Sequence, residues 1–261
     1  MYATLIAVAA LWGAVTGVLV PRAAYRLSVE PEDAWRADCP AGHLITGPAA
    51  GWLGTTRCAP CDATGVDHSP APHPGTPYAP SLLLPVLTAL SCAALAAATG
   101  PRPALAVWLL LAPFAALLAR VDAAVRRLPD VLTLPLAAAT ATLLGVVALL
   151  PGEDGRSGGS WTTSLLGGLT LGACYFVLFL VNPNGLGFGD VKLALALGLA
   201  LGWYGWGALL GGAFAGFLLF SLYGSALMLR RRTTRGITLP FGPFMIAGTL
   251  LGLLAAGLTS R

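Results

Sequence analysis

Eight long apolar segments constrain this chain more than any other feature of its sequence. Each is close to the roughly 20 residues that a helix needs to cross a bilayer, where backbone polar groups must be satisfied within the helix. Hydrophobic residues make up 56% of the 261 residues and charged residues only 10%, too few for a water-soluble protein of this size. We therefore predict an all-α polytopic membrane protein with about eight transmembrane helices. The segments lie near residues 2–20, 81–99, 104–121, 131–150, 162–181, 190–206, 207–229 and 237–258.

The basic residues predict how these helices are oriented. Loops rich in Lys and Arg stay in the cytoplasm, and an outside N-terminus places all but three of the 15 Lys and Arg residues on the inner side. Both termini are then outside. The net charge of +4 is explained by this basic inner face, so we expect the lipid bilayer, and no nucleic acid, as a partner. No basic residue precedes the first apolar segment, which favours a retained helix over a cleaved signal peptide.

A polar domain, residues 21–80, separates the first transmembrane helix (residues 1–20) from a seven-helix membrane domain (residues 81–261). It is short for an independent hydrophobic core. It contains two close-spaced ligand pairs, Cys39 with His43 and Cys58 with Cys61. Disulfides are rare in the cytoplasm, whereas thiolates and imidazoles at such spacings bind tetrahedral zinc. We predict a structural zinc site; free thiols and an exposed histidine are the alternative.

The end of this domain differs in composition from the rest. Residues 69–80 are rich in proline, which favours a stiff, extended connector. His68 and His73 lie in or beside it, without cysteine neighbours at ligand spacing, so we expect both to be solvated.

Two aspartates, Asp122 and Asp190, lie at the ends of apolar segments. An ionisable group at membrane depth is costly and therefore suggests a function. Two crossings, near residues 131–150 and 162–181, separate the pair, so both should lie on the inner side. Two adjacent carboxyl groups share a proton. The ionised one can accept a proton from water while the neutral one donates to a scissile carbonyl, which hydrolyses an amide without a metal or other cofactor.

Other roles for these aspartates remain open on the residues alone. Asp122 can pair with Arg126 at the end of its helix, and Asp190 can cap the following helix or pair with Lys192. Intramembrane carboxylates also serve proton-coupled transporters, although no convincing inverted repeat supports that reading. Asp130 follows a proline at the start of an apolar segment, and we expect it to cap a helix.

Three sequence patches together resemble the type IV prepilin leader peptidases, which are GxGD-type intramembrane aspartic proteases. The patches are residues 121–130 (VDAAVRRLPD), 187–192 (GFGDVK) and 239–244 (LPFGPF). The resemblance implies that Asp122 and Asp190 are catalytic. It also implies supporting roles for six further residues: Gly187, Gly189, Lys192, Pro240, Phe241 and Gly242.

The resemblance further implies an activity and a place in the cell. Such enzymes are hydrolases of the bacterial cytoplasmic membrane that remove a short basic leader from prepilins or pseudopilins, the subunits of type IV pili and type II secretion systems. A GxGD protease acting on other membrane helices is the alternative, but the LPD patch and the early polar domain disfavour it.

Many family members also methylate the new N-terminus with S-adenosylmethionine, and their polar domain carries two Cys-x2-Cys pairs. Cys58 and Cys61 match the second pair. The first is broken, because Gly42 follows Cys39 at the spacing where a cysteine is expected, and His43 is the available substitute. Metal binding tolerates this departure better than methyl transfer does, so N-methyltransferase activity stays a family-level expectation.

Overall fold

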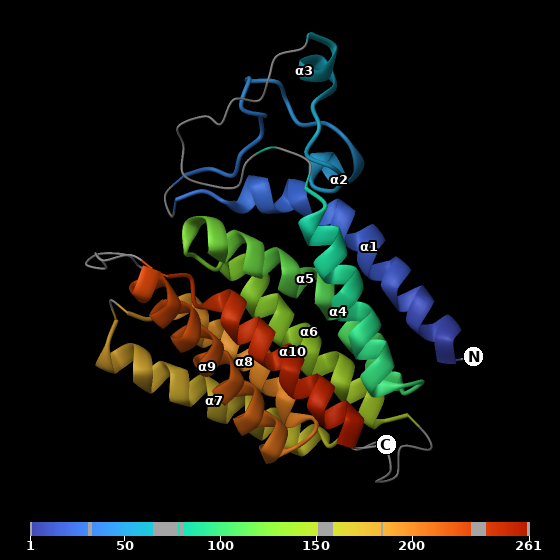
Figure 1. Ribbon diagram of the computed structural model, residues 1–261, viewed down its shortest axis with the longest axis vertical. Helices are drawn as coiled ribbons and strands as arrows, with labels where there is room; N and C mark the ends of the chain where they lie inside the picture. Colours follow the sequence, from blue (N-terminus) through green and yellow to red (C-terminus); the bar gives the residue numbers. More distant parts are fainter. Residues whose placement is uncertain are drawn as a thin grey trace.

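The computed structural model describes residues 2–30, 33–64, 78, 81–150, 159–183, 185–230 and 239–259. All eight predicted apolar segments form helices, which build a bundle beneath a small polar domain (Figure 1). The prediction of an all-α membrane protein is confirmed. The bundle helices are α1 (Tyr2–Leu27), α4 (Leu83–Thr99), α5 (Pro103–Val125), α6 (Asp130–Ala148), α7 (Trp161–Val181), α8 (Phe188–Gly202), α9 (Trp206–Arg230) and α10 (Gly242–Thr259).

The bundle helices differ in length. Within the described residues, six are long and apolar enough to cross a membrane: α1, α5, α6, α7, α9 and α10. α4 has 17 residues and α8 only 15. At 1.5 Å per residue α8 is about 22 Å long, shorter than the roughly 30 Å hydrocarbon core of a bilayer. α8 alone is therefore too short to cross a bilayer of that thickness.

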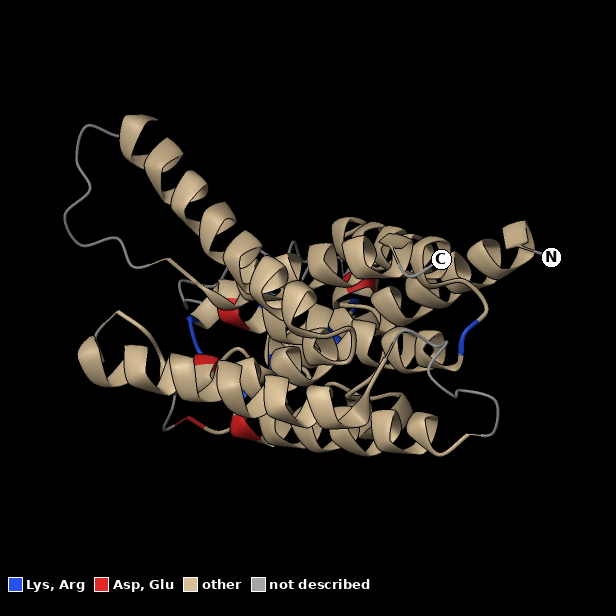
Figure 2. Cartoon of the chain, turned by 90° about the horizontal axis from the view of Figure 1, so that it is seen from below, with Lys and Arg blue, Asp and Glu red and all other residues tan. Residues whose placement is uncertain are grey.

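Two helices cross the bundle between Asp122 and Asp190, so the two predicted catalytic aspartates lie at the same end of the bundle. At the opposite end, the Tyr2 hydroxyl donates to the Ala97 carbonyl, and Gly257 packs against Ala98. α5 starts at that opposite end and finishes just after Asp122, and α6 and α7 cross twice before α8 begins close to Asp190. Figure 2 shows how few charged residues lie along the length of these helices. Which end faces the cytoplasm stays a prediction.

Two helix ends differ from the sequence-based expectation. α1 continues to Leu27, past the predicted end at residue 20, and bends near its internal Pro21 (Figure 1). Proline removes one helical hydrogen bond, but the packing of buried Ala23, Ala24 and Leu27 retains the helix beyond it. α10 begins at Gly242 rather than near residue 237, and residues 239–241 are not helical. Residues 237 and 238 lie outside the described residues, as do His68, His73 and most of the proline-rich connector.

The polar domain is attached to the bundle through the bent end of α1. The Arg22 side chain is buried and donates to the backbone carbonyls of Thr46 at 2.9 Å, Thr55 at 3.1 Å, Leu53 at 3.4 Å and Arg57 at 3.5 Å. The guanidinium fork thus satisfies its donors with backbone oxygens. The short helices of this domain are α2 (Pro48–Gly51) and α3 (Ala59–Thr64).

Glycines allow α7 and α8 to approach until their backbones touch. A Cβ atom on Gly198 would lie 2.6 Å from the carbonyl oxygen of Gly167, and one on Gly202 would lie 2.6 Å from that of Thr163. The Ser164 hydroxyl adds a hydrogen bond of 2.7 Å to the Leu199 carbonyl. Close packing of small residues is a main source of helix association in lipid, where burial of apolar surface contributes little.

We predict that Gly198→Ala destabilises the bundle, because the added methyl group forces the backbones of α7 and α8 apart. The expected loss is about 1–3 kcal/mol, the usual range for overpacking. The measurement is the thermal unfolding midpoint of the purified protein in detergent. Gly211→Ala is the matched control, since a Cβ atom there meets nothing within 4 Å. Equal midpoints for the two variants would contradict the packing argument.

Candidate active site and metal centre

Asp122 lies in the last turn of α5 and binds the first turn of α10. Its Oδ2 atom accepts a hydrogen bond of 2.9 Å from the backbone N–H of Gly242, 120 positions further along the chain. The first N–H groups of a helix have no partner within the helix, so Asp122 satisfies one of them. The next residue, Pro243, has no N–H to satisfy. A Cβ atom on Gly242 would lie 2.8 Å from Oδ2, so glycine is required for the carboxylate to come this close.

Asp190 occupies a similar position at the start of α8. Its Oδ2 atom accepts a hydrogen bond of 3.1 Å from the backbone N–H of Gly187, the residue before the helix. The backbone N–H of Asp190 donates in return to the Gly187 carbonyl at 3.0 Å. The proposed capping role of Asp190 is thus present in the structure, and it occupies only one of the two carboxylate oxygens.

The two carboxyl groups share an environment suited to chemistry. Asp122 is 4% exposed and Asp190 7%, and their charges interact electrostatically. In each, Oδ2 is held by a helix-terminal N–H, while Oδ1 accepts no hydrogen bond from the described residues. Burial opposes ionisation, and the positive end of the helix macrodipole favours it. Two restrained carboxyl groups with free oxygens can hold a water molecule between them and exchange its protons.

The two glycines of the GFGD motif have different surroundings. A Cβ atom on Gly189 would lie 2.9 Å from Cβ of Leu128, so Gly189 allows the start of α8 to pack against the loop before α6. At Gly187 a Cβ atom would make ordinary contact, 3.5 Å from Oδ2 of Asp190, and the backbone φ of −74° suits any residue. The steric requirement for glycine is therefore at Gly189.

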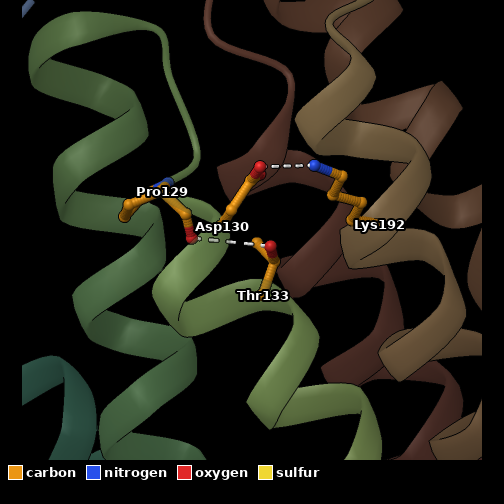
Figure 3. A network of polar contacts seen from close by, with 4 residues as sticks. All are labelled: Pro129, Asp130, Thr133 and Lys192. Carbon is orange, nitrogen blue, oxygen red and sulfur yellow. Dashed lines mark hydrogen bonds and ion pairs between the residues drawn. The ribbon is translucent and has the colours of Figure 1, made fainter. Parts of the chain in front are cut away.

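Lys192 joins α8 to the start of α6. Its Nζ atom lies 2.6 Å from Oδ2 of Asp130 and 4.8 Å from the centre of the Phe188 ring. Figure 3 shows Lys192 and Asp130 pointing toward each other, with the Thr133 hydroxyl 3.5 Å from the Pro129 carbonyl. α6 begins at Asp130, as expected for a residue at a helix start, but among the described residues its carboxylate caps no backbone N–H of α6. The ion pair with Lys192 takes its place, and Lys192 pairs with Asp130 rather than with Asp190.

Phe241 anchors the LPFGPF patch on neighbouring helices. Its ring centre lies 5.0 Å from that of Phe220, 5.2 Å from that of Phe217 and 6.0 Å from that of Tyr175. Pro240, which is half-buried, precedes it. These contacts fix the chain that presents Gly242 to Asp122. Sequence reasoning did not single out Tyr175, since it is an ordinary position of an apolar segment until the segment before α10 packs against α7.

A cavity of about 740 Å³ lies beside Asp122. It is lined mainly by apolar side chains of α4, α5 and α10, and it reaches Ala123 and Pro243, the chain neighbours of Asp122 and Gly242. The carboxyl groups themselves are outside its lining. The cavity therefore adjoins the site but does not define it.

The polar domain brings all four predicted metal ligands together. One ligand atom from each of Cys39, His43, Cys58 and Cys61 lies within 4.8 Å of the others, and the cysteines are not in disulfides. Cys39 Sγ and Cys61 Sγ are 3.9 Å apart, and His43 Nδ1 lies 3.2 Å from Cys61 Sγ and 3.7 Å from Cys58 Sγ. A tetrahedron with zinc–sulfur bonds of about 2.3 Å has sulfur–sulfur edges of about 3.8 Å. The cluster fits a tetrahedral metal of that size.

Local geometry explains why a histidine completes this cluster. The Cys39 amide donates to the His43 carbonyl at 2.9 Å, and Gly42 adopts φ +83°, which closes a tight turn and brings His43 to the sulfur atoms. Burial raises the pKa of the Cys39 thiol, but the backbone N–H of His43 and further hydrogen bonds outweigh it and lower this pKa to about 7. Burial raises the pKa of Cys61 to about 12. Thiolates are the metal-binding form.

A helical membrane bundle with two buried carboxyl groups held at helix N-termini has the architecture of an intramembrane aspartic peptidase. A model of the type IV leader peptidase family matches residues 109–258, which include both aspartates and the LPFGPF patch. This match covers more than half of the chain. The chain therefore belongs to the type IV leader peptidase family.

Curated relatives agree with this membership. A prepilin leader peptidase/N-methyltransferase of Aeromonas hydrophila is 30% identical over 226 residues, which cover 84% of this chain and 71% of the relative. Proteins of the same name from Bacillus subtilis (34% over 95 residues, 36% of this chain and 37% of the relative) and Pseudomonas aeruginosa (30% over 135 residues, 51% and 44%) also match. No solved structure matches this chain.

We predict that Gly242→Ala lowers peptidase activity by about tenfold or more, because the new methyl group displaces the Asp122 carboxyl group, and displacements of about 1 Å can cost 100-fold in rate. The measurement is the cleavage rate of a peptidase substrate at equal protein level. Gly224→Ala is the control, since a Cβ atom there is 3.7 Å from its nearest neighbour, an ordinary contact. Wild-type rates for Gly242→Ala would show that the contact with Asp122 does not matter.

Proposed function

We propose that this chain is a prepilin leader peptidase, which hydrolyses the bond between the basic leader and the apolar helix of a prepilin or pseudopilin. The observation that carries the proposal is the arrangement of Asp122 and Asp190, each with one oxygen held by a backbone N–H and one oxygen free. Membership of the leader peptidase family favours this reading over a proton-coupled transporter using the same carboxylates. It also favours it over a protease for other membrane helices.

The proposed reaction needs only the two aspartates and water. With one proton shared by the pair, the ionised carboxylate takes a proton from water, and the water oxygen attacks the scissile carbonyl carbon. The neutral partner donates its proton to the carbonyl oxygen, which gives an uncharged tetrahedral intermediate. The carbon–nitrogen bond then breaks as the nitrogen gains a proton from the pair, and a hydroxyl of the intermediate returns one. The titration belongs to the pair, so neither residue alone is the acid or the base.

The surrounding residues would hold this pair in place. Gly242 and Gly187 supply the backbone donors, Gly189 lets α8 reach the loop at Leu128, and Lys192 ties α8 to α6. Pro240 and Phe241 would present Gly242 to the site.

The proposed orientation in the bacterial cytoplasmic membrane places both termini outside. The arginines of residues 120–127 then lie with Asp122 on the inner side. A substrate helix already in the bilayer would bring its leader junction to the interface beside the pair.

We expect Asp122→Asn and Asp190→Asn each to abolish leader cleavage, because an amide can neither accept nor supply the required proton. The test is co-expression with a prepilin, followed by mass measurement of the product, which also reports any N-terminal methyl group. Asp33→Asn, at an exposed position of the polar domain, is the control and should cleave normally. Full cleavage by either of the first two variants, with the leader removed at the same bond, would refute the assignment.

For the Cys/His cluster we propose a structural zinc ion held by Cys39, His43, Cys58 and Cys61. The fit of the ligand distances to a tetrahedron supports zinc, and a short polar domain gains stability from such a staple. The site is remote in sequence from the aspartates and contributes no step to the hydrolysis. The names of the relatives also include an N-methyltransferase activity. S-adenosylmethionine would be needed only if this chain methylates its product as well.

We predict that the purified protein contains one zinc per chain and that His43→Ala or Cys61→Ala lowers this content severalfold. Elemental analysis gives the stoichiometry, and limited proteolysis reports loss of order in the polar domain. His68→Ala, at a position outside the described residues that the sequence predicts to be solvated, should leave zinc content unchanged. Full zinc content in both cluster variants would mean that these side chains are free of metal.

A further inference from the structure

Tyr175 has a buried side chain whose hydroxyl is unused. The residue is 3% exposed in α7, yet its hydroxyl forms no hydrogen bond with any described residue. The hydroxyl oxygen is nevertheless not sealed off, since it is absent from the fully enclosed polar atoms without a partner, which belong to Arg26, Thr56 and Trp203. A buried donor that lacks a protein partner but adjoins open space is satisfied by water or by a bound molecule.

The packing of α7 on α8 sets the level of this hydroxyl in the bundle. Cβ atoms on Gly168 and Gly172 would meet the side chains of Leu199 and Leu195, respectively, so each turn of α7 matches one turn of antiparallel α8. One further turn along both helices brings Tyr175 to the first turn of α8. Asp190 lies in that turn, and its charge acts electrostatically on the Tyr175 hydroxyl.

Ring contacts also place Tyr175 beside the chain segment that binds the other aspartate. Its ring stacks on Phe241 at 29° with centres 6.0 Å apart, and lies 5.6 Å from the ring of Phe217. Phe241 immediately precedes Gly242, whose N–H holds Asp122. The phenol ring is therefore held by two aromatic neighbours, one of which adjoins the residue that binds Asp122, on a helix that packs against α8.

We propose that Tyr175 is a positioning residue of the peptidase, and that its hydroxyl donates a hydrogen bond to the water molecule held by the free Oδ1 atom of Asp190. This inference rests on the proposed function. The water would accept from the phenol through one lone pair and donate to the carboxylate, which leaves its second lone pair directed at the scissile carbonyl. Tyr175 itself exchanges no proton with the substrate.

The test compares Tyr175→Phe, which keeps the ring, with Tyr175→Ala, which removes it. We expect Tyr175→Phe to lower kcat about 100-fold, the lower end of the range for removing a single active-site donor. KM should stay within about twofold and the unfolding midpoint unchanged, because the ring still packs on Phe241. Tyr204→Phe is the control: its hydroxyl accepts from Trp108 Nε1 at 3.1 Å in the turn beyond the far end of α8. A wild-type kcat for Tyr175→Phe would overturn the proposal and leave only a packing role.

A second measurement does not depend on proteolysis. A fluorinated tyrosine placed at position 175 should change its ¹⁹F chemical shift when Asp190 is replaced by Asn, and should not respond to Asp33→Asn. No response to Asp190→Asn would overturn the proposed water bridge even in an active enzyme. Failure of the wild type to cleave a prepilin would instead refute the proposed function, while the fluorine response still tests the contact.

Discussion

The hydrogen bond between Gly242 and Asp122 is the contact on which the site depends. In a bilayer the first N–H groups of α10 have no water to bind, so a buried acceptor must satisfy them. Asp122 supplies that acceptor from the end of α5. The LPFGPF patch follows from this constraint: Gly242 admits the carboxylate, Pro243 removes a second orphan donor, and Phe241 fixes the preceding chain. This one hydrogen bond thus satisfies the first N–H group of α10 and also positions the carboxyl group of Asp122.

The second aspartate is positioned by a different means. Asp190 is on α8, which glycines hold against α7 so closely that added methyl groups would meet backbone atoms. At its start, α8 contacts the loop before α6 through Gly189 and pairs with it through Lys192 and Asp130. Helix packing in lipid relies on such shape and polar contacts because the apolar surface gains little from association. Rigid neighbours are also what a reaction requiring sub-ångström placement needs.

The sequence predicted the features that depend on local composition or on the number of membrane crossings between two residues. Apolar length predicted eight helices, and two intervening crossings predicted a common end for Asp122 and Asp190. Contacts between segments that are distant in the sequence could not be predicted in this way. Its neighbours in the sequence predicted that Asp130 caps a helix, but its carboxylate forms an ion pair with Lys192, which lies 62 positions away. Tyr175 carried no signal, because the role proposed for it depends on Phe241 and Asp190, which are distant from it in the sequence. His43 was predicted as a ligand, whereas the turn at Gly42 that delivers it became visible only in the structure.

The polar domain and the bundle solve the same stability problem in different solvents. In lipid, glycine contacts and satisfied helix ends hold α7, α8 and α10. In water, a short domain has too small a hydrophobic core to be stable by itself, and a metal bound by four ligands can supply the missing stability. The connection between the two is α1: Arg22 binds four backbone carbonyls of the domain, and Arg26 lies 4.3 Å from the centre of the Trp52 ring. This connection reaches the aspartates through packing, because Val20, Ala23 and Leu27 of α1 lie in one buried cluster with Val121, the chain neighbour of Asp122 on α5.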